Sequence, residues 1–225
     1  MNKTMHNRQR CAYLVAGRVS GLKASLSCGF AILLAAGIGL ACAPAMAETN
    51  AAKGPPPMAF IKGLKAPILA NRHRVEPHAA FQTIVYPDSA GKGENTLTIE
   101  IGLSGGPRYS QAAASNDAPD EMKKMLPGVD MKIVPGLREN NYGVYGIATG
   151  TLGKNGGACV FAWQAMASTT TYQNYDPVGD PGFMNLPVRI TLRYCDAKAT
   201  PKELIALMDH LSLRTITSSR LDLLR

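Results

Sequence analysis

The sequence of 225 residues carries a formal net charge of +8, and 46% of its residues are hydrophobic. Five of the 24 Lys and Arg residues lie in the first 47 positions, which hold no Asp or Glu, so the remainder has 19 basic against 16 acidic residues and a net charge of +3. This weak charge, without a dense basic run, argues against a nucleic-acid partner. The 178 residues after position 47 are enough for one domain with a substantial core.

The first 47 residues have the three parts of a secretory signal peptide: a basic start, an apolar stretch from Ala24 to Ala43, and the small-residue site Ala45-Met46-Ala47. We therefore expect cleavage between Ala47 and Glu48 and a periplasmic or secreted protein. Two alternatives stay open. The apolar stretch of about 20 residues is just long enough to be retained as a membrane anchor. A lipidated Cys42 would instead give an outer-membrane lipoprotein. The only membrane contact expected is through such an uncleaved or lipidated leader.

The rest of the chain divides into three predicted parts. Residues 48–74 are predicted to be a flexible Pro-rich arm, because Pro55-Pro56-Pro57 favours an extended chain. Residues 75–216 are predicted to form a single globular domain, followed by a tail at 217–225.

Alternating apolar and polar residues predict strands near 81–85, 97–103 and 188–194, and Met131 with Ile133 suggests another short strand. Residues 142–151 and 159–166 are also rich in strand-forming residues, and the Asn-Gly between them is typical of a tight hairpin.

Two helices are predicted between and after these strands. The first is short, begins near Asp117 and ends before Pro127. The second begins with the capping box Thr200-Pro201-Lys202-Glu203, and its apolar face starts at Leu204. Because strands outnumber helices, we predict an α+β fold: a mostly antiparallel sheet with the capped C-terminal helix and the shorter helix packed on one face.

A possible catalytic motif is the segment Gly102-Leu103-Ser104-Gly105-Gly106, which matches the G-x-S-x-G spacing of a nucleophile elbow. With Asp176 or Asp180 and His210 in the right order, it suggests a small secreted serine hydrolase as an alternative function. The surrounding pattern lacks alternating strands and helices, and His210 falls in a predicted helix. We therefore favour a Gly-rich turn and assign no catalytic residue.

His73, Glu76 and His78 could contribute to a metal site, but no third strong ligand accompanies the two histidines. Residues 176–182 lack the acid spacing of a calcium loop. We expect no metal and no cofactor.

The segment 168–186 is a long connection between two strong strands, and long ordered loops are often functional. It contains Tyr172 and Tyr175, and the single Trp163 lies on the strand that enters it. Aromatic faces pack against the apolar faces of sugars, so all three are predicted contacts for a glucan or a partner. The alternative for Trp163 is burial in the core.

Four segments of the second half share a pattern with a known family: Asn141-Tyr142-Gly143 with Tyr145-Gly146, Cys159 to Gln164, Val188 to Cys195, and Leu204 to Met208. They resemble the cellulose-biosynthesis accessory protein family BcsN over roughly residues 140–213. The resemblance implies an exported, non-enzymatic helper of exopolysaccharide production. Its implied partners are the cellulose synthase machinery or a glucan chain, and no catalytic residue comes with it.

Cys159 and Cys195 are the cysteines that remain once the leader is removed, and an oxidising compartment favours their pairing. If their strands are antiparallel neighbours, pairing Cys159 with Cys195 also sets Phe161 opposite Arg193 and Trp163 opposite Thr191. We therefore predict a Cys159–Cys195 disulfide, with the two Cα atoms less than about 7 Å apart.

Overall fold

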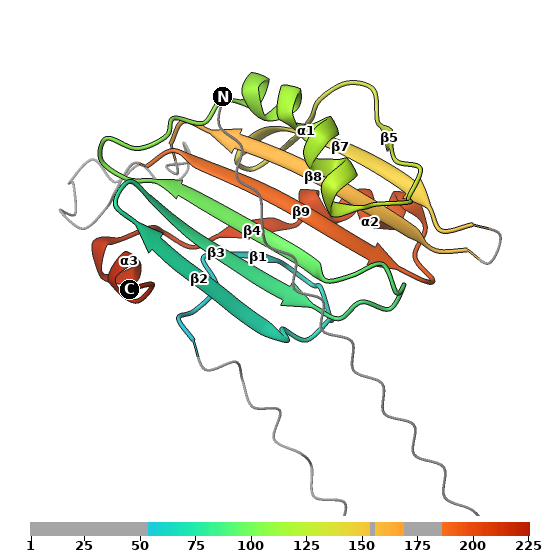
Figure 1. Ribbon diagram of the computed structural model, residues 1–225, viewed down its shortest axis with the longest axis horizontal. Helices are drawn as coiled ribbons and strands as arrows, with labels where there is room; N and C mark the ends of the chain where they lie inside the picture. Colours follow the sequence, from blue (N-terminus) through green and yellow to red (C-terminus); the bar gives the residue numbers. More distant parts are fainter. Residues whose placement is uncertain (1–53, 154–155, 169–185) are drawn as a thin grey trace, which may run out of the picture. The chain divides into compact units, whose positions relative to one another are not determined.

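The computed structural model describes residues 54–153, 156–168 and 186–225 (Figure 1). Several predicted features lie outside these residues: the leader with Cys42, Ala47 and Glu48, and the loop residues Tyr172, Tyr175, Asp176 and Asp180.

The described elements follow the chain in this order: β1 (Ala59–Ile61), β2 (Ala70–Glu76), β3 (Ala79–Tyr86), β4 (Asn95–Gly102), α1 (Gln111–Met125), β5 (Lys132–Ile133), β6 (Arg138–Asn140), β7 (Gly143–Thr151), β8 (Ala158–Met166), β9 (Val188–Asp196), α2 (Pro201–Asp209), β10 (Leu211–Leu213) and α3 (Ser218–Asp222). Within the described chain, eight strands form one sheet in the order β2-β3-β4-β9-β8-β7-β5, with β6 also paired to β7. All strand pairs are antiparallel. The predicted α+β class is confirmed.

Six of the eight strands form two three-stranded meanders, β2-β3-β4 and β7-β8-β9, joined where β4 pairs with β9, and the short β5 and β6 both pair with β7. In that pairing Thr98 lies opposite Thr191. We call the α1 side of the sheet the front and the α2 side the back.

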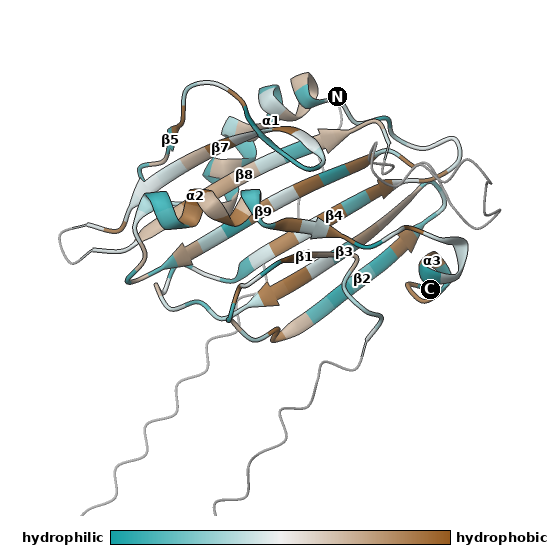
Figure 2. Ribbon diagram, turned by 180° about the vertical axis from the view of Figure 1, so that it is seen from behind, coloured by the Kyte–Doolittle hydropathy of each residue, from teal (hydrophilic) through white to brown (hydrophobic). Residues whose placement is uncertain are grey.

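The prediction that both helices pack on one face is wrong. Figure 1 shows α1 in front of the β7-β8 half, and Figure 2, from behind, shows α2 across the opposite face. The reason is that β8 is apolar on both sides: Phe161 and Trp163 pack with α1, whereas Val160 and Ala162 pack with α2. Each apolar side needs a cover to exclude water.

The predicted flexible arm at 48–74 is wrong over its described part. Met58 and Ala59 are buried in the core, and β1 pairs with β10, which places Ala59 opposite Leu213. The side chain of Gln82, itself fully buried, accepts a hydrogen bond from the Met58 N–H at 2.6 Å. Residues 70–76 then form β2 of the main sheet. The short apolar run after the prolines finds its partner at the other end of the chain, so no local pattern revealed it.

The predicted tail at 217–225 is also wrong, because it contains α3 and adds to the core. Leu221 and Leu224 are buried among back-face residues that include Ile84 and Ile101. The globular part therefore extends at both ends beyond the predicted 75–216.

Helix α1 begins six residues earlier than the predicted start near Asp117, at Gln111. Its N-cap is Ser110, whose hydroxyl accepts from the Ala113 N–H at 3.2 Å. Pro119 lies inside the helix rather than at its start. The end before Pro127 is confirmed.

Helix α2 starts as predicted. The Thr200 N–H donates to the Glu203 carboxylate at 2.7 Å, and the Glu203 N–H donates to the Thr200 hydroxyl at 3.3 Å. This reciprocal capping box satisfies two N-terminal N–H groups that the helix itself cannot pair.

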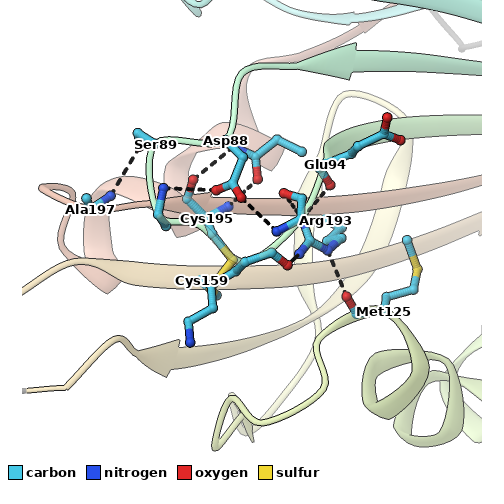
Figure 3. The surroundings of a disulfide bond; sticks show 12 residues. Asp88, Ser89, Glu94, Met125, Cys159, Arg193, Cys195 and Ala197 are labelled. Carbon is cyan, nitrogen blue, oxygen red and sulfur yellow. Dashed lines mark hydrogen bonds between the residues drawn. A yellow bond between two sulfur atoms is a disulfide. The ribbon is translucent and has the colours of Figure 1, made fainter. Parts of the chain in front are cut away.

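The disulfide between Cys159 and Cys195 is present, with a Cα–Cα distance of 4.0 Å. The predicted register is confirmed as well: Phe161 lies opposite Arg193, and Trp163 lies opposite Thr191. Beside the bond, the buried Arg193 donates to the Met125 carbonyl at the end of α1 and to the Gly93 carbonyl (Figure 3). The disulfide region therefore ties β8, β9, α1 and the β3–β4 loop together.

Candidate functional site

Within residues 54–153, 156–168 and 186–225, half of the front of the sheet is left uncovered. Helix α1 packs on β7 and β8, and no other described helix or strand lies over the front of β2, β3 and β4 (Figure 1). We call this surface the open face and define it by front-facing side chains of β2, β3, β4 and β9: Arg72, Arg74, Phe81, Thr83, Thr98, Glu100, Arg189 and Thr191.

Two parallel rows of side chains cross the strands of the open face. In the first, which we call the arginine–glutamate row, Arg74 lies opposite Phe81, Phe81 opposite Glu100, and Glu100 opposite Arg189. The Arg74 guanidinium lies 4.0 Å from the centre of the Phe81 ring, a cation–π contact.

The second row runs beside the first and consists of Arg72, Thr83, Thr98 and Thr191. The hydroxyls of Thr83 and Thr98 lie 3.1 Å apart and hydrogen-bond to each other. Thr83 and Thr98 are half-buried and offer hydroxyl groups next to the charged and aromatic groups of the first row, whereas Thr191 is buried.

The charges of the open face are largely paired. Arg189 forms an ion pair with Glu121 of α1, and Arg72 forms one with Glu94 at 2.5 Å. Burial raises the pKa of Glu100, and the nearby Arg189 offsets part of that increase. The surface is therefore polar without a strong field of either sign.

Replacing Glu100 by glutamine should stabilise the protein at neutral pH. Burial disfavours the ionised form of Glu100 in the folded protein. Below its ordinary pKa the carboxyl is neutral in both states and costs no stability, whereas the folded protein loses stability as the pH rises through the raised pKa. Glutamine stays neutral, so Glu100→Gln should melt at a higher temperature than wild type near pH 7, and the difference should vanish below about pH 4.

Thermal unfolding of both proteins across this pH range is the measurement. The exposed Glu139→Gln is the control and should track wild type throughout. A Glu100→Gln protein less stable than wild type at pH 7 would contradict the assignment.

A pocket of about 420 Å³ adjoins the open face at the end of β4, and Tyr109, Leu186 and Pro187 line it together with the Gly102–Gly106 turn. Tyr109 links pocket and face, because its hydroxyl interacts with Glu100. Burial raises the pKa of Tyr109 to about 12, and its hydroxyl hydrogen-bonds to Glu100.

The geometry around Ser104 gives little support to the hydrolase alternative. The nearby histidine is His78, whose Nδ1 lies 3.0 Å from the Ser104 backbone oxygen rather than from its hydroxyl. His210 instead caps α2 on the back of the sheet. The glycines have a packing reason, because a Cβ on Gly106 would lie 1.9 Å from the His78 carbonyl oxygen.

Two of the three residues weighed for a metal site, Glu76 and His78, take other partners. Glu76 accepts from Arg74 at 2.9 Å, and His78 contacts the Ser104 backbone. Over the described ranges, no group of three or more His, Cys, Asp or Glu side chains is placed to hold a metal ion.

Trp163 is buried, with 3% of its surface exposed, and its indole N–H donates to the Ser115 hydroxyl at 3.0 Å. The prediction that it contacts a glucan or partner is wrong, and the alternative of a core residue is confirmed. The structure brings it together with Gly146, which lies opposite it in β7.

The segments that carried the family resemblance hold the second meander against α2 and β10. Asn140 and Gln164 exchange two hydrogen bonds of 3.0 Å, and the Tyr142 hydroxyl accepts from the Leu213 N–H at 2.8 Å. The Tyr145 hydroxyl donates to Asp209 at the end of α2. These residues are structural, so the motif specifies the fold rather than a site.

The family model of the cellulose biosynthesis protein BcsN matches residues 60–222. The chain belongs to the BcsN family. The BcsN match extends well beyond the predicted 140–213 and includes both meanders and every residue of the open face. No curated protein and no solved structure matches the chain.

Proposed function

We propose that this BcsN-family protein is an exported, non-enzymatic accessory factor of cellulose biosynthesis that acts by binding through its open face. Family membership supplies the process. The observation that supports binding is the part of the sheet front that no described helix or strand covers, where aromatic, hydroxyl and paired charged groups lie together and are exposed or half-buried. In the described part of the chain His78 contacts the backbone oxygen of Ser104, a geometry that gives the hydrolase alternative little support.

Export is part of the proposal. The tripartite leader supports it, and so does the Cys159–Cys195 disulfide, since such bonds persist mainly in oxidising compartments. No helix in the described part of the chain is long and apolar enough to span a bilayer. The protein would then act in the periplasm or outside the cell, near the cellulose synthase machinery or its product.

Deleting the gene in the source organism should lower the yield of cellulose, measured by dye binding and by acid hydrolysis of the insoluble polymer. Three versions of the gene are then returned: wild type, Ser104→Ala, and a chain without residues 1–47. Wild type and Ser104→Ala should restore the yield equally, because no hydrolysis is involved. The leaderless chain should not restore it, because it stays in the cytoplasm.

Normal cellulose in the deletion strain would reject the accessory role. A Ser104→Ala protein that is exported at the wild-type level but restores nothing would instead favour the hydrolase.

A further inference from the structure

We infer that the open face binds a single cellulose-type glucan chain, laid across the strands along the arginine–glutamate row. This inference rests on the proposed function, because cellulose, the product of the process in which the family takes part, is a β-linked glucan. The argument comes from the spacing of the row, its chemistry and its charge.

The spacing of the row suits an extended glucan. Neighbouring strands lie about 4.8 Å apart, so the row from Arg74 to Arg189 spans about 14 Å. One strand spacing is close to the length of one glucosyl unit in an extended chain. A glucan that runs across the strands therefore meets one row position per sugar, over roughly three to four sugars.

The chemistry of the row matches what a pyranose ring presents. Each ring has apolar C–H faces and a rim of hydroxyls that donate and accept. The Arg74 guanidinium lies over the Phe81 ring and its side chain is exposed, so this planar group, supported by the ring, can stack on a sugar ring face. The Glu100 carboxylate can accept from these hydroxyls, and beside it lies Arg189, which is paired with Glu121 and has 14% of its side chain exposed.

Groups beside the row extend the same chemistry. Thr83 and Thr98, both half-buried, place hydroxyls along one side. Tyr109 adds a further hydroxyl beside Glu100, to which it hydrogen-bonds. A chain on the row would thus find hydrogen-bonding groups along its edge as well as beneath it.

The charge distribution favours a neutral polymer. Arg72 is paired with Glu94, Arg189 with Glu121, and Arg74 with Glu76. Paired charges leave little net field to concentrate a polyanion, whereas they still offer oriented donors and acceptors to hydroxyls.

The row is open at one end. One end of the row lies on β2, an edge strand among the described elements. The other end lies next to α1, where Gln111 accepts from the Ala165 N–H at 2.8 Å. A glucan longer than the row can therefore continue past β2 into solvent.

The test is isothermal titration of cellohexaose into the full-length gene product, purified in the form that the cell processes. Wild type should bind, and Phe81→Ala should weaken binding about tenfold through loss of the stacking surface. Glu100→Gln is a second row variant, should Phe81→Ala fold poorly, and it should also weaken binding.

The chain offers a matched control on the back of the sheet. Phe60 in β1 carries the guanidinium of Arg214 over its ring at 5.4 Å, the same pair of residue types as Phe81 and Arg74. Phe60→Ala should bind cellohexaose like wild type. Equal losses in Phe60→Ala and Phe81→Ala would overturn the assignment of the site.

Two further outcomes separate this inference from the proposed function. If wild type fails to bind cellohexaose while the deletion strain still makes less cellulose, the glucan inference is overturned and a protein partner takes its place. If wild type binds through Phe81 while the deletion strain makes normal cellulose, the ligand inference stands and the accessory role fails.

Discussion

Replacing Trp163 by alanine should lower the free energy of unfolding by about 3–5 kcal/mol, the usual range for removing a large buried aromatic side chain. The indole lies beneath α1, contacts the opposite strand at Gly146, and donates to Ser115. The substitution removes the packing and leaves a cavity between sheet and helix. Chemical denaturation followed by far-UV circular dichroism measures the change.

Gly146 provides a sharper form of the same prediction. A Cβ at this position would lie 2.1 Å from the Trp163 ring, far inside van der Waals contact, so Gly146→Ala alone should be strongly destabilising. In a Trp163→Ala protein the ring is gone, and the added methyl should be neutral or stabilising. The double-mutant cycle should therefore show strong coupling. The exposed Leu137→Ala is the control, and additive effects at the Trp163 and Gly146 positions would show that the contact does not exist.

Removing the disulfide should have the second large effect, about 3–4 kcal/mol of unfolding free energy on the chain-entropy model for a closed loop of this length. The bond joins residues separated by 36 positions, and both cysteines are fully buried. A small domain has a net stability of about 5–15 kcal/mol, so the loss is a large share. The double variant Cys159→Ala/Cys195→Ala keeps the positions apolar and isolates the effect of the cross-link.

Denaturation of wild type with and without a reductant measures the same quantity independently. The reductant should lower the free energy of unfolding of wild type to that of the double variant, and it should leave the value for the double variant unchanged. Two thiols that react with a labelling reagent in unfolded, unreduced protein would rule out the bond.

The sequence predicted best those features that depend on neighbours in the chain. The capping box at Thr200 needs only four consecutive residues, and the Cys159–Cys195 register follows once one cross-strand pair is fixed. The arm was mispredicted because β1 is short and pairs with β10 at the far end of the chain. The prediction that both helices pack on one face is wrong because β8 is apolar on both sides, and each side is covered by a different helix.

The open face was missed for a related reason. The alternation that places Thr98 and Glu100 on one side of a strand is visible in the sequence, and so is that of Arg189 and Thr191. The sequence does not show that β4 and β9 are neighbours, so it does not predict that their polar side chains form one surface. The opposite charges of Glu100 and Arg189 were the one signal that could have suggested their pairing.

The junction between β4 and β9 also sets the order in which the molecule can assemble. Each meander pairs strands that are consecutive in the chain, whereas the junction pairs Thr96 with Arg193 and closes a much longer stretch of chain. The arginine–glutamate row takes Arg74, Phe81 and Glu100 from the first meander and Arg189 from the second. An emerging polypeptide that has folded only its first meander therefore presents an incomplete row, and the full binding surface exists only once the last third of the chain has docked.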